Sequence, residues 1–171
     1  QMITRILKRA KELTHKGVKL EASSALSFFL NNSTNSNNFE ISTLNQFSLL
    51  DDYDIMSALK SWQFHDDFVL SDLSEMILNR NLLKIKLRNK AFSSSKLEAV
   101  KKDVMLEYKL DTHEASYFVF HGHVDNLAYN PKQGGLKILY KNGNTKDIIK
   151  ASDHLSSKVL SKTVSKHYIC F

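Results

Sequence analysis

The chain has 171 residues and a mass of 19.6 kDa, enough for one medium domain or two small ones with a buried core. Apolar residues make up 42% of it and charged residues 25%, which excludes intrinsic disorder for most of the chain. Residues 1–79 carry 7 basic and 10 acidic side chains, a net charge of −3, whereas residues 80–171 carry 17 and 8, a net charge of +9. The basic half suggests an anionic partner, or simply a solvated lysine-rich surface.

A single cysteine, Cys170, excludes an internal disulfide and a cysteine-based zinc or iron–sulfur site. No apolar run approaches the roughly 20 residues of a membrane helix, and the first residues lack the apolar core of a signal peptide. We therefore expect no membrane partner and a reducing, cytoplasmic compartment.

One apolar face predicts an amphipathic helix that starts at residue 2 and ends before Gly17. The residues on that face are Ile3, Ile6, Leu7, Ala10 and Leu13. Charged side chains, Arg9 among them, are expected on the other faces. Because no capping residue precedes the helix and the sequence starts with Gln rather than Met, we expect the C-terminal fragment of a larger protein.

Further helices are predicted beyond a polar run. The Asn- and Ser-rich residues 31–38 are expected to form a surface loop. Apolar residues at helical spacing then predict a short helix near 39–50 and two more helices, capped by the aspartates at 51–52 and at 66–67. The last two should be antiparallel and joined by a tight turn at 64–65.

The apolar period changes to two after residue 82, which is typical of strands. Strands are predicted from the alternation over 83–88 and from the apolar run 117–121, with a helix over 95–109 between them. A hairpin with a primed turn is predicted at Asn142-Gly143.

The predicted fold class is therefore α+β. An N-terminal helical segment over 1–82, continuing a missing N-terminal domain, is followed by a small α+β domain over 83–171. That domain should hold a small, mainly antiparallel sheet with one long helix, and residues 168–171 are expected to close the sheet.

Two histidine motifs could bind a metal. His65-Asp66 pairs an imidazole with a carboxylate, but a phosphate-cleaving metal site needs further ligands, and the only upstream histidine, His15, lies on a basic helix. A helix–turn–helix junction with an aspartate N-cap is the preferred interpretation. His121 and His123 point the same way from a strand, without a third ligand placed to converge on them. We predict no metal site and no catalytic residue here.

The densest basic stretch is the candidate binding site. Arg80 stands near the end of a predicted helix, and Lys84, Lys86 and Arg88 share one face of the following strand. Arg forks onto pairs of phosphate oxygens and Lys supplies a point charge, so this row could grip a nucleotide triphosphate. The alternative is a solvated face whose lysines discourage edge pairing. No aromatic residues are interleaved with the row, so sequence-specific nucleic-acid binding is not expected.

Several strings resemble HD-superfamily phosphohydrolases, in the part of those proteins that lies downstream of their metal site. The matching strings are residues 6–13, 50–62, 69–73, 79–85, 117–120 and 128–132. Asp-Asp-Tyr-Asp at 51–54 and Arg-Asn-Leu-x-Lys at 80–84 are the most specific. The strings look like the bacterial branch of the family, which is similar to the deoxynucleotide triphosphohydrolases, including the mammalian SAM-and-HD-domain enzyme.

The resemblance implies that the catalytic core lies ahead of the matched segment. That core is a helical domain with His, His-Asp and Asp around a divalent metal, so the metal is expected there and no cofactor is expected in this fragment. In nucleotide-regulated relatives, the Arg and Lys of the Arg-Asn-Leu-Phe-Lys string grip an activating nucleotide. The matching positions are Arg80 and Lys84, with Leu83 in place of the aromatic residue.

We therefore expect the C-terminal assembly and regulatory portion of an HD-family phosphohydrolase, not catalytic by itself and assembled as a homo-oligomer. Its parent would cleave deoxynucleoside triphosphates or related phosphate esters. One alternative is an oligomerisation module without nucleotide binding, in which the acidic first half of one subunit meets the basic second half of another. The other is a nonspecific nucleic-acid-binding domain.

Overall fold

The computed structural model describes residues 1–33, 40–126, 136–151 and 164–171. Within these residues the chain divides into two units, which are described separately: unit 1 comprises 1–84, 98–120 and 170–171, and unit 2 comprises 85–97 and 121–169. Most of the predicted loop at 31–38 and the whole string at 128–132 lie outside the described residues.

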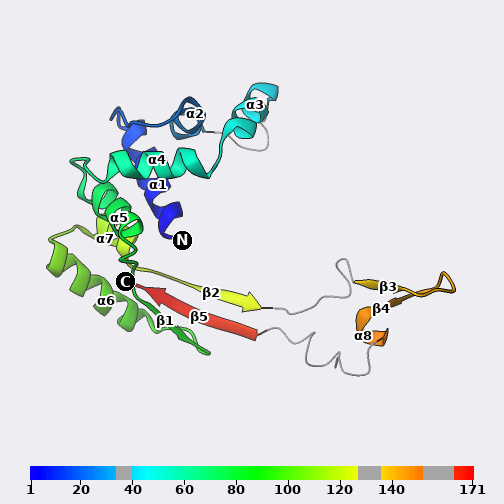
Figure 1. The fold of residues 1–171 in the computed structure, drawn as a ribbon. Helices are drawn as coiled ribbons and strands as arrows, with labels where there is room; N and C mark the ends of the chain where they lie inside the picture. Colours follow the sequence, from blue (N-terminus) through cyan, green and yellow to red (C-terminus); the bar gives the residue numbers. More distant parts are fainter. Residues whose placement is uncertain (34–39, 127–135, 152–163) are drawn as a thin grey trace. The chain divides into compact units, whose positions relative to one another are not determined.

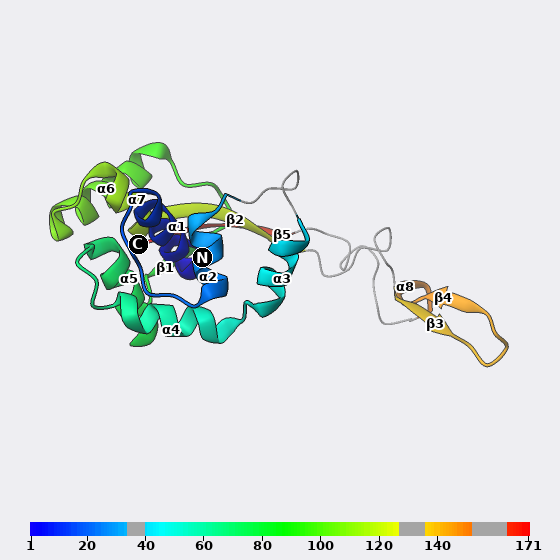
Figure 2. The same ribbon diagram turned by 90° about the horizontal axis from the view of Figure 1, so that it is seen from above.

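Unit 1 is helical, as predicted for the first half of the chain. Its helices are α1 (Met2–His15), α2 (Ser24–Asn31), α3 (Ile41–Leu49), α4 (Asp52–Trp62), α5 (Phe68–Leu78) and α7 (Thr112–Phe118), with most of α6 (Ser94–Tyr108). Helix α1 contacts α2 and α5, and α4 contacts α5 (Figures 1 and 2). The core side chains include Leu59, Trp62, Leu70, Leu73 and Phe118, each less than 3% exposed.

Aspartate caps explain where α4 and α5 begin. Asp51 accepts hydrogen bonds from the N–H groups of Tyr53 and Asp54, and the Asp54 carboxylate accepts from the Asp51 N–H, which completes a capping box. Asp67 caps α5 by accepting from the Leu70 N–H at 2.9 Å. Of the two aspartates predicted as possible caps for each helix, Asp51 caps α4 and Asp67 caps α5.

The prediction of a strand over 117–121 is wrong for its first half. Tyr117 and Phe118 belong to α7, which Asp111 opens with a second capping box to Glu114. The apolar run arises because Tyr117 and Phe118 are both buried in the helical core. The strand begins only at Phe120.

Unit 2 contains strands, as the change of period predicted. The elements that lie wholly or mostly in it are β1 (Ile85–Arg88), β2 (Phe120–Asn126), β3 (Lys137–Leu139), β4 (Thr145–Asp147), α8 (Ile148–Ala151) and β5 (Val164–Cys170). The strand order of the larger sheet is β1-β5-β2, so the last strand of the chain lies in its centre. The described elements are mixed helix and strand, which confirms the α+β class.

The hairpin at β3–β4 forms with a different turn from the one predicted. Ile138 lies opposite Lys146, and β3 and β4 are antiparallel. The Gly143 N–H donates to Tyr140 O at 2.9 Å, and Gly143 has φ +80° whereas Asn142 is not left-handed. Either type of primed turn at Asn142-Gly143 would need positive φ at Asn142, so this is a longer loop with a glycine bulge. In the described part of the chain, no helix is long and apolar enough to cross a membrane.

Candidate functional site

Arg80 occupies a left-handed backbone position at the end of α5. The Asn81 N–H donates to Met76 O at 2.9 Å and the Arg80 N–H donates to Ile77 O at 3.2 Å, a helix ending that normally places glycine where Arg80 stands. Arg80 has φ +57°, which costs a residue with a Cβ atom about 1 kcal/mol. Lys109 ends α6 in the same way, with φ +55° and the Leu110 N–H donating to Met105 O at 3.0 Å, so this backbone position is a helix ending and does not by itself mark a site.

Lys84 is held by backbone pairing to the last residue of the chain. The Lys84 N–H donates to Phe171 O at 2.7 Å, and the Phe171 N–H donates to Lys84 O at 3.0 Å. Both Arg80 and Lys84 are exposed in unit 1, and among the described residues neither side chain has a hydrogen bond or ion pair. Their charges are available to an anion from solution.

The other two basic residues of the predicted row belong to unit 2. Lys86 and Arg88 are exposed in β1. The Arg88 guanidinium stacks 3.7 Å from the centre of the Phe92 ring, and its Nη2 donates to Ala91 O at 2.9 Å. Arg88 is therefore engaged by its own turn, which makes it a weaker candidate for phosphate than Arg80.

The apolar side of β1 is not buried as an alternating strand would suggest. Ile85 and Leu87 are 56% and 58% exposed, and only Leu83 before the strand is partly buried. The alternation therefore predicted the strand but not a packed face beneath it.

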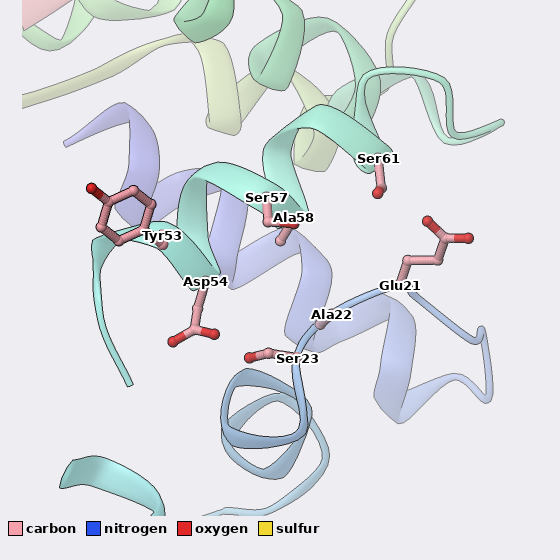
Figure 3. A pocket seen from close by; sticks show the side chains of 8 residues that line it. All are labelled: Glu21, Ala22, Ser23, Tyr53, Asp54, Ser57, Ala58 and Ser61. Carbon is pink, nitrogen blue, oxygen red and sulfur yellow. The ribbon is translucent and has the colours of Figure 1, made fainter. Parts of the chain in front are cut away.

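A groove of about 470 Å³ lies between α4 and the segment that precedes α2 (Figure 3). Its lining residues are Glu21, Ala22, Ser23, Tyr53, Asp54, Ser57, Ala58 and Ser61. The Ser23 hydroxyl and the Asp51 N–H donate to the Asp54 carboxylate and hold its pKa below the usual value. The lining combines two carboxylates with hydroxyl groups and has no basic side chain, so it would repel a phosphate.

A largely buried ion pair joins α1 to the start of α5, with Asp67 15% exposed. Arg9 Nε donates to Asp67 Oδ1 at 3.1 Å and Arg9 Nη2 donates to Asp67 Oδ2 at 2.6 Å. The prediction that Arg9 lies away from the apolar face is wrong, because its side chain is only 7% exposed. Arg9 lies three residues after the buried Ile6 and four before the buried Leu13, a spacing that could have revealed it.

Further polar groups complete the cluster around Arg9. Its guanidinium lies 3.5 Å from Glu12 and 3.7 Å from Glu114. The Tyr117 hydroxyl and His113 hydrogen-bond to Glu12; although burial raises the pKa of Glu12, these bonds hold it below its usual value. Burial and the bond to Glu12 raise the pKa of Tyr117. The cluster fastens α1, α5 and α7 together.

The histidine motifs have structural partners. His65 Nδ1 accepts the Asp67 N–H at 2.9 Å in the turn between α4 and α5, as the helix–turn–helix interpretation predicted. His123 Nε2 lies 3.6 Å from Asp125 Oδ2, and its ring centre is 6.0 Å from that of His167. Within the described ranges, no group of three or more His, Cys, Asp or Glu side chains could hold a metal ion.

No protein-family model and no curated protein matches this chain. Among solved structures, it is similar to a phosphohydrolase from Bacteroides thetaiotaomicron, known from a crystal structure at 2.20 Å resolution. The two share 38% sequence identity with a TM-score of 0.89. The match covers 99% of this chain and 43% of that one, so the chain spans less than half the length of the phosphohydrolase.

Proposed function

We propose that this chain is part of a phosphohydrolase. The observation that carries the proposal is the similarity to the Bacteroides thetaiotaomicron phosphohydrolase, which combines 38% identity with 99% coverage of this chain. Identity at this level over nearly the whole chain supports a shared function as well as a shared fold. More than half of the neighbour has no counterpart in these residues, so the proposal concerns a larger parent protein.

The finer proposal is the C-terminal assembly and regulatory portion of an HD-family, metal-dependent enzyme. It rests on the resemblance carried by the strings at 51–54 and 80–84. The divalent metal and the hydrolytic chemistry belong, in this proposal, to the rest of the parent protein. Deoxynucleoside triphosphates or related phosphate esters are the proposed substrate class.

A regulatory nucleotide is the proposed ligand of Arg80 and Lys84. Two observations support this ligand: both side chains are exposed, and neither has a partner among the described residues. A triphosphate would take a forked pair of hydrogen bonds from the guanidinium and a point charge from the ammonium group. The polar groove beside α4 is excluded for this role by its carboxylates.

Calorimetric titration of the purified chain with dGTP tests the nucleotide site. Arg80→Ala and Lys84→Ala should each weaken binding at least about tenfold, because a hydrogen bond to a charged group contributes about 1.5–3 kcal/mol. Lys102→Ala is the matched control, since Lys102 is an exposed lysine on α6. Absence of dGTP binding, or equal loss in the control, would remove the nucleotide site.

The reading frame upstream of residue 1 tests the parent enzyme. We expect it to encode His, His-Asp and Asp with the spacing of a metal shell, and we expect the 171-residue chain alone to leave deoxynucleoside triphosphates intact in the presence of Mn²⁺. Turnover by the purified chain alone would contradict the assignment of the chemistry to the rest of the parent.

A further inference from the structure

Helix α3 exposes all of its apolar side chains, together with Ser42, Asn45 and Ser48, and Thr43 is its buried residue. Ile41, Leu44 and Leu49 are 79%, 51% and 64% exposed, and Phe47 is 60% exposed. Thr43 is only 4% exposed, and Gln46 has its Oε1 buried with no hydrogen-bond partner in the part of the chain that the structure describes. An exposed apolar surface rimmed by polar residues marks an interaction site.

The β3–β4 hairpin has an exposed apolar surface of its own. Leu136 and Leu139 are 62% and 70% exposed, and Ile138 and Tyr140 are each 38% exposed. The hairpin packs with the four-residue helix α8 (Figure 2). A two-stranded hairpin is at best marginally stable in water without a surface to pack on.

The two surfaces carry opposite charge. Residues 40–59, which include α3 and most of α4, contain four acidic and no basic residues, a net charge of −4. Residues 136–151, which form the hairpin and α8, contain four lysines and one aspartate, a net charge of +3. Opposite potentials steer two surfaces together and disfavour contact of either with its own kind.

We propose that the β3–β4 hairpin of one copy of this chain docks on the α3 face of a second copy. The α3 face is defined here as Ile41, Leu44, Phe47 and Leu49 with the acidic residues Glu40 and Asp52. The contact would cover the apolar residues of both surfaces and place the lysines of the hairpin beside the carboxylates. Made reciprocally, it gives a closed dimer with two-fold symmetry. The inference rests on the assembly role in the proposed function and names the surfaces that serve it.

Sedimentation equilibrium of the full 171-residue chain over a range of concentrations tests the contact. We expect a reversible dimer that dissociates on dilution, without added nucleotide. The hairpin variant Lys141→Glu/Lys150→Glu and the helix variant Glu40→Lys/Asp52→Lys should each raise the dissociation constant at least tenfold. The matched control is Lys96→Glu/Lys102→Glu, which makes the same charge change on exposed residues of α6. Circular dichroism of each variant reports whether it is folded.

Mixing the two variants gives the sharpest result. In the mixed dimer, the hairpin with reversed charge meets the α3 face with reversed charge, and the other hairpin and α3 face are both unchanged. The mixed dimer should therefore form with nearly the original affinity. A contact within one copy could not be rescued by mixing. The apolar component is tested by Ile41→Ser/Leu49→Ser, against Leu106→Ser as the control for an exposed apolar residue on α6.

Three outcomes would overturn the proposal: a chain that stays monomeric at all concentrations, variants that associate like the original chain, or mixed variants without rescue. A monomer would mean that another occupant, such as the rest of the parent protein, covers the α3 face. The dGTP titration is independent of this measurement, so loss of the nucleotide site with retained dimerisation, or the reverse, separates the two proposals.

Discussion

Asp67 stabilises unit 1 in two ways, and Asp67→Ala removes both. Losing the N-cap of α5 costs about 1 kcal/mol. Removing one partner of a buried ion pair costs about 3–5 kcal/mol, because the remaining charge stays buried without its partner. Arg9 keeps weaker contacts with Glu12 and Glu114, at 3.5 and 3.7 Å, so the lower value of about 3 kcal/mol applies. We expect a total loss of about 4 kcal/mol in the free energy of unfolding.

Two further variants separate the cap from the ion pair. Asp67→Asn should keep the cap, since Asn caps helices as well as Asp, and should lose about 3 kcal/mol. Arg9→Met/Asp67→Asn should lose clearly less than the two single variants together, because no buried charge is left unpaired. Urea unfolding at pH 7, followed by circular dichroism and extrapolated to water, measures these differences. A loss of only about 1 kcal/mol in Asp67→Ala, or strict additivity, would refute this account of the pair.

The pair also sets the direction of the pH dependence. Burial raises the pKa of the Asp67 carboxyl, but hydrogen bonds from Arg9 and the Leu70 N–H, with the Arg9 charge, outweigh burial and hold that pKa below its usual value. A folded-state pKa below the unfolded value gives stability that is complete above the unfolded pKa, about 3.9, and is lost as the pH falls through the folded pKa. Acidification below about pH 4 should therefore destabilise the chain more than it destabilises Asp67→Asn. Parallel acid profiles would contradict this.

Three other variants test single features. Arg80→Gly should be more stable to urea than Arg80→Ala by about 1 kcal/mol, because only the glycine relieves the left-handed position; equal stability would remove the strain argument. Gly122→Ala should lower the free energy of unfolding by about 1–3 kcal/mol, because the new Cβ would lie 2.7 Å from Tyr168 Oη. This loss should be smaller when Tyr168 is replaced by Leu; an equal loss would show that the clash with Tyr168 is not its cause. Tyr117→Phe should remove a phenol that ionises above the usual tyrosine range from a spectrophotometric titration, since burial and Glu12 raise the pKa of Tyr117; an unchanged titration curve would contradict this.

Local chemistry made the helical half of the chain predictable. Gly17 ends α1 with φ +86°, and the aspartates at 51 and 67 begin α4 and α5, because a positive φ and an unsatisfied helix N–H each demand particular residue types. The same chemistry was present in Asp111 and Glu114, whose capping box opens α7. The apolar run that follows was interpreted as a strand, although a buried helix gives the same short pattern.

Tertiary pairing escaped prediction for a different reason. Arg9 can be buried because Asp67, 58 residues away, accepts two hydrogen bonds from its guanidinium. Charge alone indicated an exposed residue, and only its spacing from Ile6 and Leu13 favoured burial. The alternating pattern likewise predicts a common face for Lys84, Lys86 and Arg88. It does not predict the turn after the strand, which stacks Arg88 on Phe92.

The exposed apolar side chains of α3 and of the β3–β4 hairpin show what periodicity cannot predict, namely the surface that covers an apolar face. Periodicity identifies an apolar face but cannot say which surface covers it, and the apolar residues of α3 and β3 would pass for core residues in the sequence. On α3 these exposed side chains lie in the same helix as Gln46, whose Oε1 is buried without a hydrogen-bond partner among the described residues. The two surfaces carry net charges of opposite sign, so a second copy, as we propose, would cover both at once. Rescue on mixing the two charge-reversed variants would distinguish this partner from one that covers only a single surface.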